Sequence, residues 1–179
     1  MTITLVRHAE VLEEYQGKYN GHIDIGLSKN GFLQAQKLAK ELDGETFDAI
    51  YCSDLLRAQQ TLKAFKHVSN PVFSTKLREK SWGIHEGKSF EEIEKSGIKY
   101  ENFEQWLGAL DGEDINTYLN NTQNYFNETI ADSGAKNILV ITHAGFIKGL
   151  VSSINNISLE DAFSHSLGYA SFIKLKKLK

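Results

Sequence analysis

The chain of 179 residues has one cysteine, one proline and no long apolar run. The single thiol, Cys52, excludes an internal disulfide framework and cannot build a thiolate metal site, and its apolar neighbours predict that it packs in a buried strand. No stretch approaches the roughly 20 apolar residues that span a bilayer, and the N-terminus lacks a signal-peptide pattern. The net charge of −3 provides no basic field for nucleic acid or acidic lipid. These absences predict a cytoplasmic protein without nucleic-acid or membrane partners, and they leave its oligomeric state open.

The same short sequence pattern occurs twice, 135 residues apart. Residues 3–9 and 138–144 are each an apolar run of strand length that stops at a histidine followed by an alanine. A continuous apolar run is typical of a strand buried on both faces, in a parallel sheet covered by helices. If the two strands are neighbours, His8 and His143 meet at the edge where such sheets bind ligands, with Arg7 beside them.

Between and after these segments, helical and strand patterns alternate. Ser28 and Asp54 are predicted N-caps of two amphipathic helices. The terminal lysines are predicted to form a solvated tail. The alternation predicts a three-layer α/β/α sandwich with a mostly parallel central sheet. The further predicted elements are helices over 28–44, 54–65 and 145–153, and strands over 47–52, 72–73 and 169–175.

Residues 89–132 differ in character from the rest of the chain. They are predicted to be helical in two or three pieces, are rich in aromatic side chains and lack a strong strand. They include ten acidic residues and only two basic ones, Lys95 and Lys99. A solvated helical face is the simpler interpretation, and an acidic docking surface is the alternative. We expect this segment to be a lid-like part of a single domain that spans residues 1–179.

Five side chains suit phosphoryl transfer when they are taken together: Arg7, His8, Arg57, Glu79 and His143. A planar guanidinium can bind phosphate oxygens in bidentate fashion, and each arginine lies by the end of a strand. Arg57 also falls in the first turn of its helix, where free backbone N–H groups favour anions. A neutral imidazole is a competent nucleophile, and a second histidine can hydrogen-bond a phosphate oxygen. A carboxylic acid, for which Glu79 is the candidate, can protonate the departing alkoxide.

The segment Leu5-Val6-Arg7-His8-Ala9-Glu10 resembles the signature of the histidine phosphatase superfamily, also called the phosphoglycerate mutase-like family. Four further segments resemble the family's motifs in the family's order, so the likeness covers nearly the whole chain. Residues 82–93 resemble a small bacterial phosphatase branch that includes α-ribazole-phosphate phosphatase. The four segments are residues 21–28 (Gly-x-x-Asp-x-Pro-Leu-Thr in the family), 51–61 (Ser-x-Leu-x-Arg-Ala-x-Gln-Thr), 77–87 (Leu-x-Glu-x-x-x-Gly-x-x-Glu-Gly) and 142–145 (the second-histidine motif).

The resemblance implies the phosphoglycerate mutase-like fold and a role for each site residue. His8 is the implied nucleophile and Glu79 the implied proton donor. His143 is catalytic and also belongs to the implied phosphate pocket, whose other members are Arg7, Arg57 and Ala144. The resemblance also implies that no metal and no cofactor is required, which agrees with the charge that two arginines and a histidine already supply.

Three positions depart from the family's pattern. Ala9 replaces a glycine, and Gly26 replaces a proline in a turn. Six residues past the nucleophile, where many members have a phosphate-binding asparagine, this chain has Glu14. A carboxylate would repel the phosphate, so we expect Glu14 to point away. Asn20 and Gln16 are weak candidates to replace the asparagine.

The family includes hydrolases and mutases, which share the first half of the reaction. Its mutases carry long insertions with basic residues between the acid and the second histidine, whereas the interval from Glu79 to His143 is 64 residues here and strongly acidic. We therefore predict hydrolysis of a small phosphate monoester with a neutral or aromatic body, such as an α-ribazole phosphate-like molecule. A cofactor-dependent phosphoglycerate mutase and a non-catalytic phospho-ligand binding protein are the alternatives. Turnover of p-nitrophenyl phosphate would exclude the second of these.

Overall fold

The computed structural model describes residues 1–176, which build one five-stranded sheet in the order β3-β2-β4-β1-β5. Every neighbouring pair is parallel except β1 and β5, so the sheet is mostly parallel as predicted. Parallel strands need crossover connections, and helices provide them here. The strands are β1 (Thr2–Arg7), β2 (Ala49–Ser53), β3 (Val72–Ser74), β4 (Asn137–Thr142) and β5 (Phe172–Lys176).

The predicted pairing of the two histidine-terminated strands is confirmed. β1 and β4 are parallel neighbours at the centre of the sheet, and Arg7 pairs with Thr142 in their register. The backbone N–H of His8 then donates to the carbonyl of Thr142 (2.9 Å). The shared register therefore brings His8 and His143 to the same edge of the sheet.

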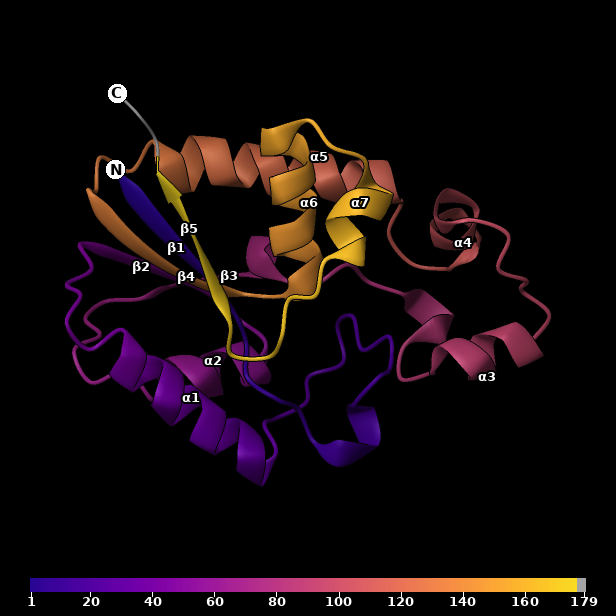
Figure 1. The fold of residues 1–179 in the computed structure, drawn as a ribbon, viewed down its shortest axis with the longest axis horizontal. Coiled ribbons are helices and arrows are strands. Elements are labelled where there is room, and N and C mark those ends of the chain that lie inside the picture. The colour runs from indigo at the N-terminus through magenta and orange to yellow at the C-terminus, as the bar shows by residue number, and fades with distance from the viewer. Residues whose placement is uncertain (177–179) are drawn as a thin grey trace.

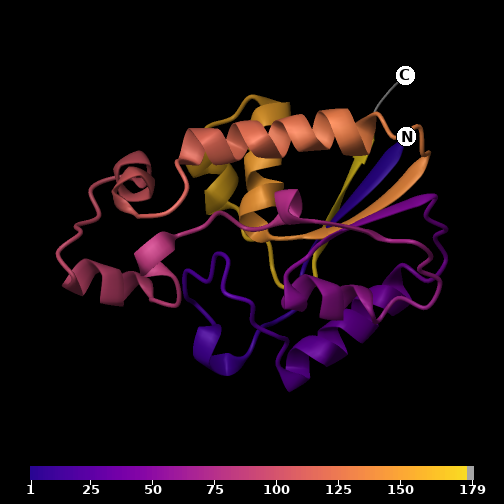
Figure 2. The same ribbon diagram turned by 180° about the vertical axis from the view of Figure 1, so that it is seen from behind.

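Helices cover both faces of the sheet, which gives the predicted three layers (Figures 1 and 2). One face is covered by α1 and α2, and the opposite face by α5 and α6, with α7 packed on α6. The short helices α3 and α4 lie together at one end of the molecule. The helices are α1 (Lys29–Glu41), α2 (Leu56–Leu62), α3 (Phe90–Lys95), α4 (Phe103–Ala109), α5 (Ile115–Tyr125), which continues as a π-helical turn (Phe126–Ala131), α6 (Ala144–Asn155) and α7 (Leu159–Ser164); 3-10 turns occupy Glu13–Tyr15, Thr75–Leu77 and Gly83–His85.

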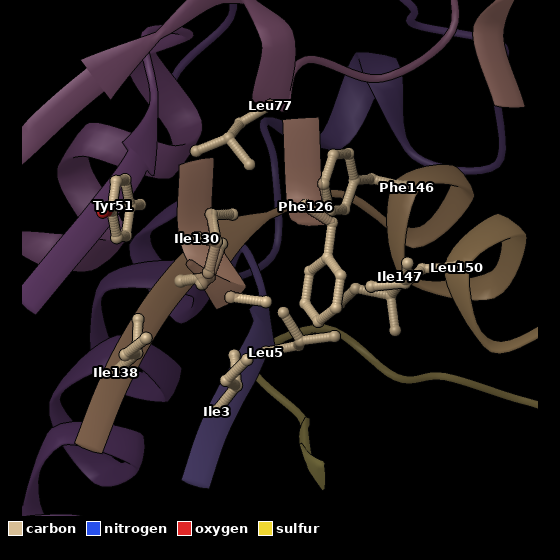
Figure 3. Packing of buried hydrophobic residues seen from close by; sticks show 12 residues of the cluster. Ile3, Leu5, Tyr51, Leu77, Phe126, Ile130, Ile138, Phe146, Ile147 and Leu150 are labelled. Carbon is tan, nitrogen blue, oxygen red and sulfur yellow. The ribbon is translucent and has the colours of Figure 1, made fainter. Parts of the chain in front are cut away.

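The two largest apolar clusters pack against the sheet, one on each of its faces. Alternate residues of a strand point to opposite faces, so Ile3 and Leu5 contribute to one cluster while Val6 contributes to the other. Figure 3 shows the first cluster, in which Phe126 and Phe146 pack with the side chains of the strands. Cys52 is fully buried in the second cluster, and its predicted packing in a strand is confirmed. The central strands are thus held rigidly from both sides.

One predicted helix cap is confirmed and the other is wrong. The hydroxyl of Ser28 accepts the N–H of Gly31 (2.9 Å) and caps α1. Asp54 does not cap α2, because its carboxylate is bound by the guanidinium of Arg78. The first amide of α2, that of Leu56, donates instead to the carboxylate of Asp24 (2.7 Å), which comes from a distant loop. The predicted free N–H groups at this helix start are therefore partly occupied by protein.

Element boundaries shift by a few residues from the predictions, and α7 is not predicted. The helices expected over 28–44 and 54–65 end earlier, at Glu41 and Leu62, and the last strand begins at Phe172. Residues 177–179 of the expected solvated tail lie outside the described residues. Within residues 1–176, no helix is both long and apolar enough to cross a bilayer.

The acidic segment 89–132 forms three helical pieces, as predicted. Its acidic side chains are not all part of a solvated face, because some of them bind the protein backbone. Trp106 and neighbouring apolar side chains pack around Trp82 in a third cluster. Glu113 accepts the N–H of Ser81 (2.7 Å), and Asp111 accepts the N–H of Ile84 (3.0 Å). These carboxylates bind the backbone of the loop that follows Glu79, so they position this loop.

Candidate active site

His8 lies directly after β1 with one ring nitrogen bound and the other free. Its Nδ1 is 2.8 Å from the carbonyl oxygen of Ala9, which can only accept, so Nδ1 carries the proton. The lone pair is then on Nε2. Burial lowers the pKa of His8 well below its usual value, and the charges of Arg57 and Arg7 add to this effect. The ring is therefore a neutral imidazole with an available nucleophilic nitrogen.

The guanidinium groups of Arg7 and Arg57 flank this histidine. Arg57 is buried and donates to the carbonyls of Ile23 and Gly21 (both 2.7 Å), which fixes its plane. Arg7 donates to the carbonyl of Leu167 and lies over the ring of a tyrosine, 4.0 Å from its centroid. Burial lowers the pKa of Arg57 to about 10, so it remains charged near neutral pH. Two fixed positive charges thus face the place where a phosphate would meet His8.

His143 is completely buried at the end of β4, with its ring centroid 5.1 Å from that of His8. Its Nε2 is 2.8 Å from the hydroxyl of Ser53, while its buried Nδ1 has no partner in the described structure. If the hydroxyl donates, Nδ1 carries the proton and can donate to a phosphate oxygen. Burial, followed by the charge of Arg57, lowers the pKa of His143 well below its usual value. Ser53 is thus a positioning residue that the sequence reasoning did not single out.

Glu79 is held by two backbone amides. Its Oε1 accepts the N–H of Lys80 and its Oε2 accepts the N–H of Gly145 (both 3.0 Å). Within residues 1–176 neither oxygen forms an ion pair with an arginine. A Cβ atom at Gly145 would lie 1.9 Å from Oε1, so any side chain at this position would have to displace the carboxylate. The backbone at the start of α6 therefore sets the position of the candidate acid.

Gly145→Ala is accordingly expected to displace Glu79 without removing it. We expect an alkyl phosphate to be hydrolysed about 10²-fold more slowly, the lower end of a general acid's contribution. A p-nitrophenyl ester, whose leaving group needs no proton, should be affected much less. Steady-state kinetics on both substrates measure this difference, with Gly108→Ala as the control because a Cβ there meets only open space. Equal losses on the two substrates would contradict this role.

Five of the six predicted site residues line a single cavity of about 210 Å³, and the sixth, His143, is buried against His8. The cavity lies beyond the carboxyl ends of β1 and β4, where ligands bind in sheets of this kind. Within residues 1–176, no three His, Cys, Asp or Glu side chains are grouped to hold a metal ion. The five that line the cavity are Arg7, His8, Arg57, Glu79 and Ala144.

The two candidates for the missing asparagine lie in different places. Glu14 is exposed in a 3-10 turn and does not line the cavity, as expected of a carboxylate near a phosphate site. Gln16 donates to the carbonyl of Val11 and is also outside the cavity. Asn20 lines the cavity, and its side-chain amide donates to a backbone carbonyl (2.7 Å). Asn20 is thus the one of the two that can reach a ligand.

Several further side chains of the cavity were not predicted. Tyr169 stacks on Arg7 and approaches His8, with a distance of 5.7 Å between ring centroids. Tyr19 and Trp82 contribute aromatic surface. Trp82 lies in the 77–87 segment at a position that the motif leaves open, and no motif covers Tyr19 or Tyr169. The aromatic composition was the only available signal.

Comparisons with known proteins agree with this geometry. The model of the histidine phosphatase superfamily (branch 1) matches residues 3–177. Phosphoserine phosphatase 1 of Hydrogenobacter thermophilus is 27% identical over 179 residues, covering 95% of this chain and 83% of that protein. The adenosylcobalamin/alpha-ribazole phosphatase of Escherichia coli is 27% identical over 168 residues, covering 89% and 82%. The solved structure of Bacillus stearothermophilus YhfR matches with a TM-score of 0.85 at 23% identity, covering 98% of this chain and 90% of that chain.

Proposed function

The chain belongs to the histidine phosphatase superfamily (branch 1) and is a phosphatase of small phosphorylated molecules, and from this premise we propose which residues carry the reaction. His8 is the nucleophile, Glu79 the general acid, and Arg7, Arg57, His143 and Ala144 form the phosphate pocket. The observation that supports this most directly is the free Nε2 of a neutral His8 between two arginines in one cavity with Glu79.

In the first step, Nε2 of His8 attacks the phosphorus of a monoester. The N–P bond forms as the bond from phosphorus to the ester oxygen breaks, and Glu79 gives its proton to the departing alkoxide. The charge on the equatorial oxygens is stabilised by Arg7, Arg57 and His143. The product of this step is phosphohistidine and a free alcohol.

In the second step, a water molecule replaces the alcohol. The oxygen of the water attacks the phosphorus while Glu79, now ionised, takes a proton from the same water, and the N–P bond breaks. Inorganic phosphate leaves, His8 is neutral again and Glu79 is protonated again. Protons and charges balance over the cycle without a cofactor.

The same proposal covers the organisation of the chain and its location. Residues 1–179 form one catalytic domain in the cytoplasm, and residues 89–132 act as a lid. The lid contacts the cavity through one of its lining residues. Trp106 of α4 donates to the hydroxyl of Tyr19 (2.8 Å), and Tyr19 lines the cavity. The lid therefore acts on the cavity through the side chains on which it packs.

We expect activity that survives chelation and is blocked by vanadate. Arg7 and Arg57 supply the positive charge that a metal would otherwise provide, and neutral His143 adds a hydrogen-bond donor, so EDTA should leave the hydrolysis of p-nitrophenyl phosphate unchanged. Vanadate adopts the five-coordinate geometry of the reacting phosphorus and should inhibit competitively. Initial rates with and without each reagent measure both effects. Loss of activity in EDTA that Mg²⁺ or Zn²⁺ restores would refute the metal-independent mechanism.

A further inference from the structure

The cavity around His8 carries more positive charge than one phosphate needs. Lys18 and Lys148 line it together with Arg7 and Arg57, and Glu79 is the one carboxylate among the lining residues in the described structure. The ten acidic residues of 89–132, all of which the structure describes, contribute nothing to the lining. The lining of this cavity is therefore basic, and the carboxylate of the lid that comes nearest, Glu113, lines a second cavity that shares Glu79 with it.

Lys148 is held in place at the cavity by α7. It lies on α6 one turn after Ala144, and its ammonium donates to the carbonyl of Phe163 (2.9 Å) and faces the ring of the same residue. Within residues 1–176 this ammonium forms no ion pair. Burial lowers the pKa of Lys148, the charge of Arg7 adds to this effect, and the charge of Glu79 partly offsets it. A half-buried ammonium without an ion-pair partner is stabilised by an anion that binds beside it.

Lys18 approaches the same cavity from a loop near the N-terminus. Its backbone pairs with Ser89, and its neighbour Tyr19 is fixed by the hydrogen bond from Trp106. In the described part of the chain the ammonium of Lys18 makes neither a hydrogen bond nor an ion pair. A second unpaired cation thus lines the cavity, on a loop whose position is set by contacts with the lid.

The charges suggest what the substrate carries besides its phosphate. Arg7 and Arg57 together match the two negative charges of a phosphate monoester. Lys18 and Lys148 are then left without an ion-pair partner in the described structure. We propose that they bind a carboxylate on the organic part of the substrate, so that this phosphatase acts on short phosphorylated carboxylic acids. The proposal rests on the function assigned above, because it takes the phosphate to lie against His8.

The size of the cavity agrees with a short substrate. Its volume of about 210 Å³ is below the range of roughly 300–1,000 Å³ that drug-sized ligands occupy. The proposal replaces the expectation of a neutral or aromatic body, which rested on the charge of the lid. An α-ribazole phosphate-like molecule has no carboxylate for the two lysines.

A pair of substrates that differ in one group tests the proposal. 3-Phosphoglycerate and glycerol 3-phosphate share their carbon chain and phosphate, and only the first has a carboxylate. We expect kcat/KM to be at least about 10-fold higher for 3-phosphoglycerate, the contribution of one charge-assisted hydrogen bond. Lys148→Met and Lys18→Met should each bring this ratio toward one. Lys148→Arg should keep most of it, and Lys37→Met, an exposed lysine on α1, should leave it unchanged.

Direct binding separates this proposal from the proposed reaction. Calorimetry with the wild-type protein should show tighter binding of 3-phosphoglycerate than of glycerol 3-phosphate, whether or not either compound turns over. Equal binding and equal kcat/KM for the two compounds would overturn the carboxylate site, even in an active phosphatase. A ratio that persists in both methionine variants would also overturn it. Absence of turnover with preferential binding would support the site and count against the reaction alone.

Discussion

Glu79→Gln is expected to slow the hydrolysis of an alkyl phosphate by about 10²–10⁴-fold, the usual contribution of a general acid. Glutamine has nearly the same shape, but it has no acidic proton to give. An alkyl phosphate leaves as a strongly basic alkoxide and needs that proton, whereas p-nitrophenolate is stable without it. The variant should therefore hydrolyse p-nitrophenyl phosphate at a rate much closer to that of the wild type.

The measurement is kcat for both substrates in wild-type and variant proteins, with folding checked by circular dichroism. A purely structural Glu79 would fix a pocket arginine and would lower both rates together, with weaker phosphate binding. The contacts favour the catalytic role. The carboxylate is held by the amides of Lys80 and Gly145, and in the described structure it forms no ion pair with an arginine. Equal losses on the two substrates would remove Glu79 from the acid role.

His8→Ala is expected to lower turnover of every substrate by on the order of 10⁴-fold or more, because it removes the nucleophile itself. The choice of leaving group should make little difference, in contrast to Glu79→Gln. Arg7 and Arg57 remain, so inorganic phosphate should still bind and compete. The exposed His67→Ala is the matched control and should leave kcat unchanged. An active His8→Ala protein would show that another group attacks the phosphorus.

The sequence was sufficient to predict the centre of the fold and most of the residues that meet at the candidate site. Two apolar runs that end in histidine have one favourable arrangement, as adjacent parallel strands buried on both faces, and β1 and β4 adopt it. Arg57 was expected at the same edge because it follows another strand that is predicted to be buried. These residues lie next to strong local patterns, so the fold fixes where they meet.

The residues that the sequence did not reveal depend on contacts between distant loops. Asp54 looked like a cap because it precedes a helix, but Arg78 competes for its carboxylate and Asp24 takes the amide instead. Lys148 looks like any lysine on an amphipathic helix until α7 orients it toward the cavity. The acidic composition of residues 89–132 likewise says little about the cavity, because none of their carboxylates lines it. Charge counted along a segment does not say which side chains face a cavity.

The most direct test of the whole account is to trap the phosphorylated enzyme. A substrate labelled in its phosphate is mixed with the protein, the reaction is quenched within one turnover, and the label on the protein is located by peptide mapping. We predict label on the peptide that contains His8, stable in base and labile in acid as expected of phosphohistidine, and none on His8→Ala. Undiminished label on His8→Ala, or label that is stable in acid, would contradict the assignment of His8 as the nucleophile.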